Sequence, residues 1–169
     1  MADYSPTHIF ALIPAGFADS QQQKKILKDL FGLKQSVKVY ATSVPQYNSV
    51  LLYAWEADKQ EYLVPSPDIQ PTVVKYLSEL HHIEEHNKLI MDFDAERKQT
   101  CLLLAEGEQL IAANSYRTID FPTAIYYMIE LLDKSQINPQ QTTVNLIGTA
   151  EDKELAMLKS YVKNIKFRR

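Results

Sequence analysis

Two apolar runs joined by a short glycine-containing connection constrain this chain more than any other feature. Leu102–Leu104 and Leu110–Ala113 flank Glu106–Glu108, a pattern that predicts a β-hairpin. Lys88–Asp94 precedes the hairpin and predicts one further strand, and Asn114–Thr118 prolongs the second strand of the hairpin toward a helix start. The C-terminal half is therefore expected to begin with three consecutive strands.

An amphipathic helix is predicted to follow these strands. Asp120 can cap its first turn, and Pro122 lies in that turn, where a missing N–H group costs little. Apolar residues then recur at helical spacing and give the helix one apolar face. They are Phe121, Ala124, Ile125, Met128 and Leu132. Asn138-Pro139 ends the pattern.

One strand and one helix complete the C-terminal half. Thr143–Ile147 predicts a short strand that ends at Gly148, where a positive φ would suit the turn into the helix. Thr149–Asp152 matches a capping box. The apolar stripe of the final helix consists of Leu155, Leu158, Val162 and Ile165. This helix runs into the terminal segment, where Ile165–Phe167 can form a last short strand.

The N-terminal half predicts an alternation of strands and helices. His8–Pro14 predicts a short buried strand, and Val37–Thr42 alternates like a second one. Ser20–Gln23 resembles a capping box at the start of a helix that Gly32 is well placed to end. The apolar face of that helix consists of Ile26, Leu27, Leu30 and Phe31.

Prolines mark the remaining N-terminal elements. Pro45 is expected to open a helix that runs through Trp55 and places Val50, Leu51 and Ala54 on one face with Trp55. Glu61–Val64 predicts a strand, and Pro71 opens a helix at Thr72–Glu85.

The C-terminal half resembles the actin, sugar-kinase and heat-shock-chaperone ATPase superfamily. It is most similar to an uncharacterised bacterial family whose members have a degenerate actin-like ATPase fold. The shared features are a hairpin, a strand end at Asn114 to Tyr116, a helix with Tyr126-Tyr127, a strand ending in Leu146-Ile147-Gly148, and a helix end with a short β segment at Tyr161 to Phe167. The resemblance covers residues 88–169 best and extends to His8–Pro14 and Val37–Pro45.

This resemblance implies an α/β protein built from two related, ribonuclease H-like subdomains. The polar stretch around Glu84–Asn87 is the best internal boundary, so the expected domains are a reduced N-terminal α/β subdomain at 1–86 and an actin-like ATPase subdomain at 87–169. The N-terminal half has the expected order βαβα(β)α, and the C-terminal half βββαβα(β). Members of the family are longer at the N-terminal end, so this chain is expected to be either a reduced version or a truncated one.

Composition excludes several classes of function. A net charge of −3 argues against a nucleic-acid partner, because such binding depends on neutralising phosphates. The single cysteine, Cys101, excludes an internal disulfide and fits the reducing cytoplasm. No apolar run approaches the roughly 20 residues of a membrane span, and the N-terminus lacks the basic and apolar regions of a secretion signal.

Active members of the superfamily hold nucleotide phosphates on glycine-containing turns. By the resemblance, the corresponding loops here are Asp92–Arg97, with Asp92 and Asp94 as its carboxylates, and Gly148-Thr149. The first loop contains no glycine, and Phe93 and Glu96 are expected to crowd and repel an anion. We therefore expect a vestigial nucleotide site and no bound cofactor.

A second motif, His82-Ile83-Glu84-Glu85-His86, matches H-x-x-E-H. On a helix, residues four apart share a face, so His82 and His86 could hold Zn²⁺ with Glu85 as the base. The alternative is a solvated helix end, where histidines complement the helix dipole. We favour the alternative and expect no metal.

The leading hypothesis is a non-catalytic relative of actin-like ATPases that binds proteins or acts as a scaffold, similar to the cytoplasmic actin-like scaffolds of pilus and secretion machines. The alternatives are a vestigial nucleotide-binding regulator and a small zinc hydrolase using His82, Glu85 and His86. Because the N-terminal half lacks a matching meander, its strands are expected to leave open edges, which predicts self-association or an obligate partner.

Overall fold

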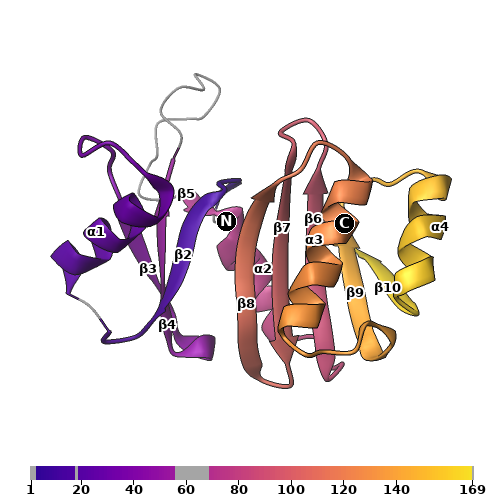
Figure 1. Ribbon diagram of the computed structural model, residues 1–169. Helices are drawn as coiled ribbons and strands as arrows, with labels where there is room; N and C mark the ends of the chain where they lie inside the picture. Colours follow the sequence, from indigo (N-terminus) through magenta and orange to yellow (C-terminus); the bar gives the residue numbers. More distant parts are fainter. Residues whose placement is uncertain (1–2, 18, 56–68, 169) are drawn as a thin grey trace. The chain divides into compact units, whose positions relative to one another are not determined.

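The computed structural model of the chain describes residues 3–17, 19–55 and 69–168 (Figure 1). The chain forms two compact units, Met1–Ser78 and Glu79–Arg169. The division between them falls inside helix α2 (Thr72–His81), ahead of the boundary expected after residue 86.

The C-terminal unit is built on a five-stranded sheet in the order β10-β9-β6-β7-β8. The strands β6 (Asn87–Asp94), β7 (Gln99–Glu106) and β8 (Gln109–Arg117) form an antiparallel meander. The strands β9 (Thr142–Ile147) and β10 (Asn164–Arg168) continue the sheet in parallel from β6. The helices α3 (Phe121–Lys134) and α4 (Asp152–Tyr161) alternate with these two strands, which confirms the predicted order.

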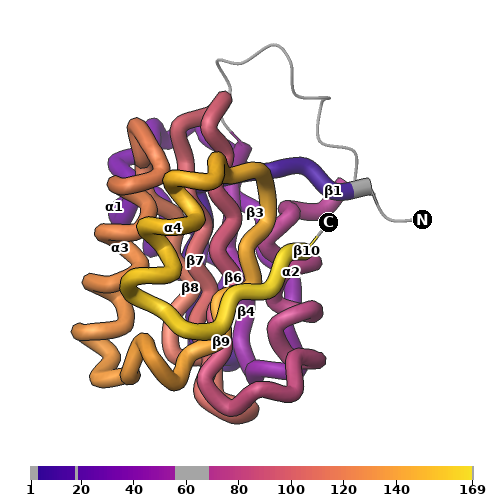
Figure 2. Tube along the Cα trace, turned by 90° about the vertical axis from the view of Figure 1, so that its right-hand side faces the viewer, coloured from indigo at the N-terminus to yellow at the C-terminus, as the bar shows by residue number. Residues whose placement is uncertain are grey.

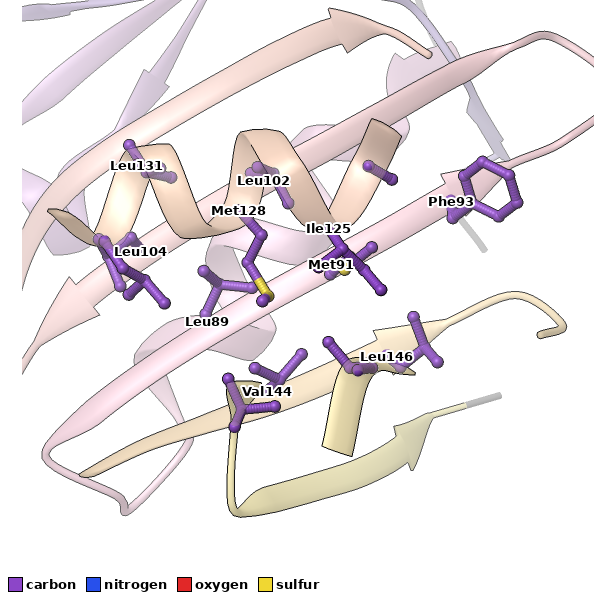
Figure 3. Packing of buried hydrophobic residues seen from close by; sticks show 14 of the residues in the cluster. Leu89, Met91, Phe93, Leu102, Leu104, Ile125, Met128, Leu131, Val144 and Leu146 are labelled. Atoms are coloured by element: carbon purple, nitrogen blue, oxygen red, sulfur yellow. The ribbon is translucent and has the colours of Figure 1, made fainter. Parts of the chain in front are cut away.

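The core of this unit lies between the sheet and its two helices. Alternate residues of three strands point to this face and are buried with the apolar sides of α3 and α4. They are Leu89, Met91 and Phe93 of β6, Leu102 and Leu104 of β7, and Val144 and Leu146 of β9. Figure 3 shows Ile125 and Met128 of α3 lying against Met91 and Leu89. The predicted apolar face of α3 is buried throughout.

Two of the three predicted helix caps are displaced by one or two residues. Asp120 caps α3 as predicted, accepting a 2.8 Å hydrogen bond from the N–H of Thr123. The first helix, α1 (Ser20–Phe31), is capped by Asp19 instead of Ser20, because the Asp19 carboxylate accepts the N–H groups of the first turn. α4 is capped at Glu151 instead of Thr149, and the Glu154 side chain accepts the Glu151 N–H at 2.7 Å.

The N-terminal unit contains a three-stranded antiparallel sheet in the order β2-β4-β3, formed by β2 (Ile9–Pro14), β3 (Tyr40–Val44) and β4 (Ser49–Ala54). β1 (Asp3–Ser5) and β5 (Ile69–Pro71) form a separate parallel pair. Leu27 of α1 is fully buried among residues of this sheet, and Gly32 ends the helix in the left-handed conformation as predicted. Leu30 and Phe31 are exposed, so the apolar face of α1 is narrower than expected.

The predicted helix from Pro45 to Trp55 is wrong. Pro45–Tyr47 forms a single 3-10 turn, Asn48 adopts a left-handed conformation with φ of 47°, and the chain continues as β4. Leu51, Leu52, Tyr53 and Ala54 of β4 are all buried, so both faces of this strand are covered. A strand buried on both faces shows no alternation, and its apolar run resembles a buried helix.

Other N-terminal elements begin or end at different residues from those expected. β3 starts at Tyr40 instead of Val37. α2 ends at His81, four residues before the predicted end at Glu85. The expected order βαβα(β)α is therefore incorrect for the described residues, which form ββαββ followed by β5 and α2. The strand predicted at Glu61–Val64 lies outside the described residues.

The packing of α3 predicts that two Met→Ala variants lose different amounts of unfolding free energy. Met128 of α3 is fully buried, whereas Met157 of α4 is 41% exposed. Met128→Ala should lower the free energy of unfolding of the C-terminal unit by about 2–4 kcal/mol because it leaves a cavity. Met157→Ala should change it by less than about 0.5 kcal/mol. Urea unfolding followed by circular dichroism measures both, and equal losses would contradict the described core.

Candidate functional site

The candidate site lies where the carboxyl ends of β6 and β9 meet. These strands are parallel neighbours, and Asp92 of β6 is in register with Ile147 of β9. The pairing therefore brings together four residues of the predicted vestigial loops at the carboxyl ends of the two strands. They are Asp92, Asp94, Gly148 and Thr149. In open α/β sheets, ligands bind at the carboxyl ends of the strands.

The turn between β6 and β7 is closed by Asp94 and Arg97. The Asp94 carboxylate accepts the backbone N–H of Arg97 at 2.9 Å and the Arg97 guanidinium at 2.7 Å. Partial burial pushes the pKa of Asp94 upward, but the hydrogen bonds from Arg97 outweigh it and hold the pKa below its usual value. Both carboxylate oxygens of Asp94 are thus engaged within the turn.

Phe93 does not face this turn. Its side chain is buried, and its ring meets the Phe121 ring edge-on with the centroids 5.2 Å apart. The expectation that Phe93 crowds an anion is wrong, because Phe93 continues the inward face that begins with Leu89 and Met91. Glu96 is exposed at the turn, and Lys98 adopts a positive φ of 53° where a glycine would be least strained.

Gly148 holds the second loop close to the first. Its φ is +96°, as predicted for the turn after β9, and a Cβ at this position would lie 2.8 Å from the carbonyl oxygen of Phe93. Real Cβ atoms essentially never approach a backbone atom this closely. The glycine is therefore required both by its dihedral angle and by the backbone of the neighbouring strand.

The H-x-x-E-H motif does not lie on a helix. Since α2 ends at His81, residues 82–86 form an irregular connection to β6, and the spacing of four no longer places His82 and His86 on one face. His86 instead approaches Glu106 of β7, with its Nε2 atom 3.7 Å from a carboxylate oxygen. The helical zinc geometry that the sequence allowed is therefore incorrect.

Glu85 is engaged by a lysine from the other end of the unit. Lys166 of β10 donates a hydrogen bond to the Glu85 carboxylate, and this interaction lowers the pKa of Glu85. Within the described ranges, no group of three or more His, Cys, Asp and Glu side chains is arranged to hold a metal ion.

A buried polar contact that the sequence did not single out attaches β10 to the sheet. Asn145 of β9 is fully buried, and its side-chain oxygen accepts a 2.9 Å hydrogen bond from Nε of Arg168. The Asn145 amide donates to the carbonyl of Leu89 on β6 at 3.3 Å. An asparagine between Val144 and Leu146 was the signal for this contact, because a buried amide needs partners.

Cys101 lies opposite Asp92 in the β6–β7 pair. Burial raises the pKa of the Cys101 thiol, and the Asp92 carboxylate raises it further. A thiol is nucleophilic only as a thiolate, so this environment suits a structural thiol.

The fold is an actin-like ATPase fold. The chain is similar to a crystal structure from Bacteroides thetaiotaomicron, a protein with actin-like ATPase fold and unknown function, with a TM-score of 0.80 and 17% identity over 98% of this chain and 66% of that one. It is also matched to a structure of the PilM–PilN type IV pilus biogenesis complex, with a TM-score of 0.46 and 12% identity over 95% of this chain and 65% of that one. This chain thus spans just under two thirds of the length of each of these proteins.

Residues 4–165 match the family described as "Protein of unknown function (DUF3822)", and the chain belongs to this family. No curated protein matches the chain. Across the described residues, the helices are all too short or too polar to cross a membrane.

The close approach at Gly148 predicts a specific loss of stability. Gly148→Ala should lower the free energy of unfolding by about 2–4 kcal/mol, because the new methyl group meets a backbone carbonyl and φ is strained. The matched control is Gly107→Ala, which also has a positive φ but faces only the side chain of His86 at 3.4 Å. This control should lose about 1 kcal/mol. Thermal unfolding measures both, and equal losses would show that the Phe93 carbonyl is not the constraint.

Proposed function

We propose that this protein is a non-catalytic relative of actin-like ATPases that works by binding proteins, with its nucleotide site no longer functional. The observation that carries the proposal is the Asp94–Arg97 contact. The two hydrogen bonds from Arg97 occupy the carboxylate that would otherwise face a metal–phosphate group. The same guanidinium also holds the turn in its closed conformation. The backbone N–H groups of this turn are those that would have to approach a phosphate.

The residues of this turn support the same conclusion. Residues 95–98 are Ala95, Glu96, Arg97 and Lys98, so the turn contains no glycine. Glycine-containing turns bind phosphate because their backbone N–H groups can come close to the anion. The exposed charges of the turn, Glu96 and Lys98, have opposite signs, so the turn offers no net positive charge beyond the Asp94–Arg97 pair.

The N-terminal sheet supports a role in protein binding. Among the described strands, β2 and β3 each pair only with β4, so each has one edge without a strand neighbour. Neither strand contains a charged residue that would protect its edge. We infer that this unit pairs with a second copy of the chain or with another protein, since added strands commonly satisfy such edges.

Ligand-induced stabilisation separates this proposal from its two alternatives. A ligand at 100 times its dissociation constant raises the free energy of unfolding by about 2.7 kcal/mol. We expect no shift in melting temperature with ATP and Mg²⁺ or with Zn²⁺ for untagged protein. A shift with ATP–Mg²⁺ but not with Mg²⁺ alone would favour a nucleotide-binding regulator. A shift with Zn²⁺ that His86→Ala removes would favour a zinc enzyme.

Self-association through the N-terminal unit has its own test. Light scattering at micromolar concentration should give a mass above that of the 19.4 kDa monomer, or a monomer that recruits a partner through the same edge. Ser43 is exposed on β3, so Ser43→Lys should reduce the association by placing a charge on that edge. Gln21→Lys on α1 adds the same charge away from the edge and should have no effect. Association that is equal in both variants would contradict the role of β3.

A further inference from the structure

The C-terminal sheet also ends in a strand that has one edge without a strand neighbour. β10 is the outermost strand of the order β10-β9-β6-β7-β8 and, among the described strands, pairs only with β9. The backbone N–H and C=O groups on its outer side are therefore available to an added strand. In Figure 2, α4 leads directly into β10, which lies at the near side of this unit.

One face of β10 is apolar. Ile165 packs against the core cluster, and Phe167, two residues further on, points to the same face but is 61% exposed. The preceding helix exposes Met157 and Tyr161, which lie one turn apart and are 41% and 45% exposed. Large apolar side chains thus remain in solvent on the α4 side of the β10 edge.

The other face of β10 is basic. Lys166 and Arg168 point to this face, and exposed Lys163 immediately precedes the strand. Their partners within the unit hold them in place: Lys166 donates to Glu85, and Arg168 donates to the neutral amide of Asn145. Residues 162–168 contain these three cations and no carboxylate, so Glu85 balances only part of the positive charge.

We propose that the β10 edge is a docking site for an extended polypeptide segment in which acidic and apolar residues alternate. A strand added beside β10 would follow the same two-residue period, so its side chains would lie alternately beside Phe167 and beside Lys166 and Arg168. Backbone hydrogen bonds would supply affinity, and the alternating side chains would supply selectivity.

The charge on β10 selects this occupant over a second copy of the chain. If two copies of β10 paired symmetrically, their basic faces would lie side by side, and like charges on neighbouring strands destabilise a pair. An acidic partner instead complements the unbalanced cations. The inference is independent of the role proposed for the N-terminal unit, because it concerns a different sheet and a different edge.

Fluorescence anisotropy with labelled peptides of about ten residues tests this site on the full chain, since strands of five to six residues are typical. The first peptide alternates glutamate with valine. The second has the same composition with the glutamates and valines in separate blocks, and the third replaces glutamate with lysine. We expect saturable binding of the first peptide only. Equal binding of the alternating and blocked peptides would show non-specific charge attraction and overturn the proposal, as would no binding at all.

Variants and backbone methylation locate the binding site. Phe167→Ser and Lys166→Gln should each weaken binding about fivefold or more, and Lys25→Gln on α1 should leave it unchanged.

N-methylation of alternate peptide residues should abolish binding in one register and spare it in the other, because only alternate N–H groups of an added strand face β10. Circular dichroism confirms that each variant is folded. Binding that survives both β10 variants, or that ignores the methylation register, would place the peptide elsewhere and overturn the proposal. If the chain dimerises and Phe167→Ser abolishes the dimer, a second copy of the chain binds at the β10 edge, and the proposal is overturned.

Discussion

Burial of α3 against the middle of the C-terminal sheet is the interaction on which the rest of this unit depends. Met128, Ile125 and Phe121 share one buried cluster with residues of β6, β7 and β9. β9 lies far from the β6–β7 hairpin in the sequence and joins the same core. Apolar burial of this kind is the dominant favourable term in folding. The same packing determines which side chains of each strand point away from the core. It therefore also determines which side chains lie on the opposite face of the sheet and at the strand ends.

Two loops meet at the candidate site because β6 and β9 pair in parallel, and Gly148 lies against the carbonyl of Phe93. The turn after β6 is closed by a salt bridge between Asp94 and Arg97. A turn stabilised by its own side chains gains local order, and both oxygens of the Asp94 carboxylate are engaged in this contact.

Long-range polar contacts determine the other end of the sheet. Arg168 reaches the buried Asn145, and Lys166 reaches Glu85 from 81 residues away in the sequence. These contacts attach a short edge strand that buries little apolar surface of its own. They also orient its cations on one face, which gives the β10 edge two chemically different sides.

The C-terminal architecture could be predicted from the sequence alone, because the signals there are local. The hairpin turn at Gly107, the cap at Asp120 and the helical spacing from Phe121 to Leu132 each act within a few residues. That residues 49–54 form a strand could be learned only from the tertiary structure. A strand covered on both faces loses the alternation of polar and apolar residues that would identify it. The tertiary structure also shows that the H-x-x-E-H motif is not helical, because α2 ends at His81, and that Phe93 is a core residue.

The hydrogen-bond partners of Asp94, Glu85 and Asn145 lie at very different distances from them in the sequence. Arg97 lies three residues from Asp94, whereas Lys166 and Arg168 are brought to their partners only by sheet pairing, which no short sequence pattern specifies.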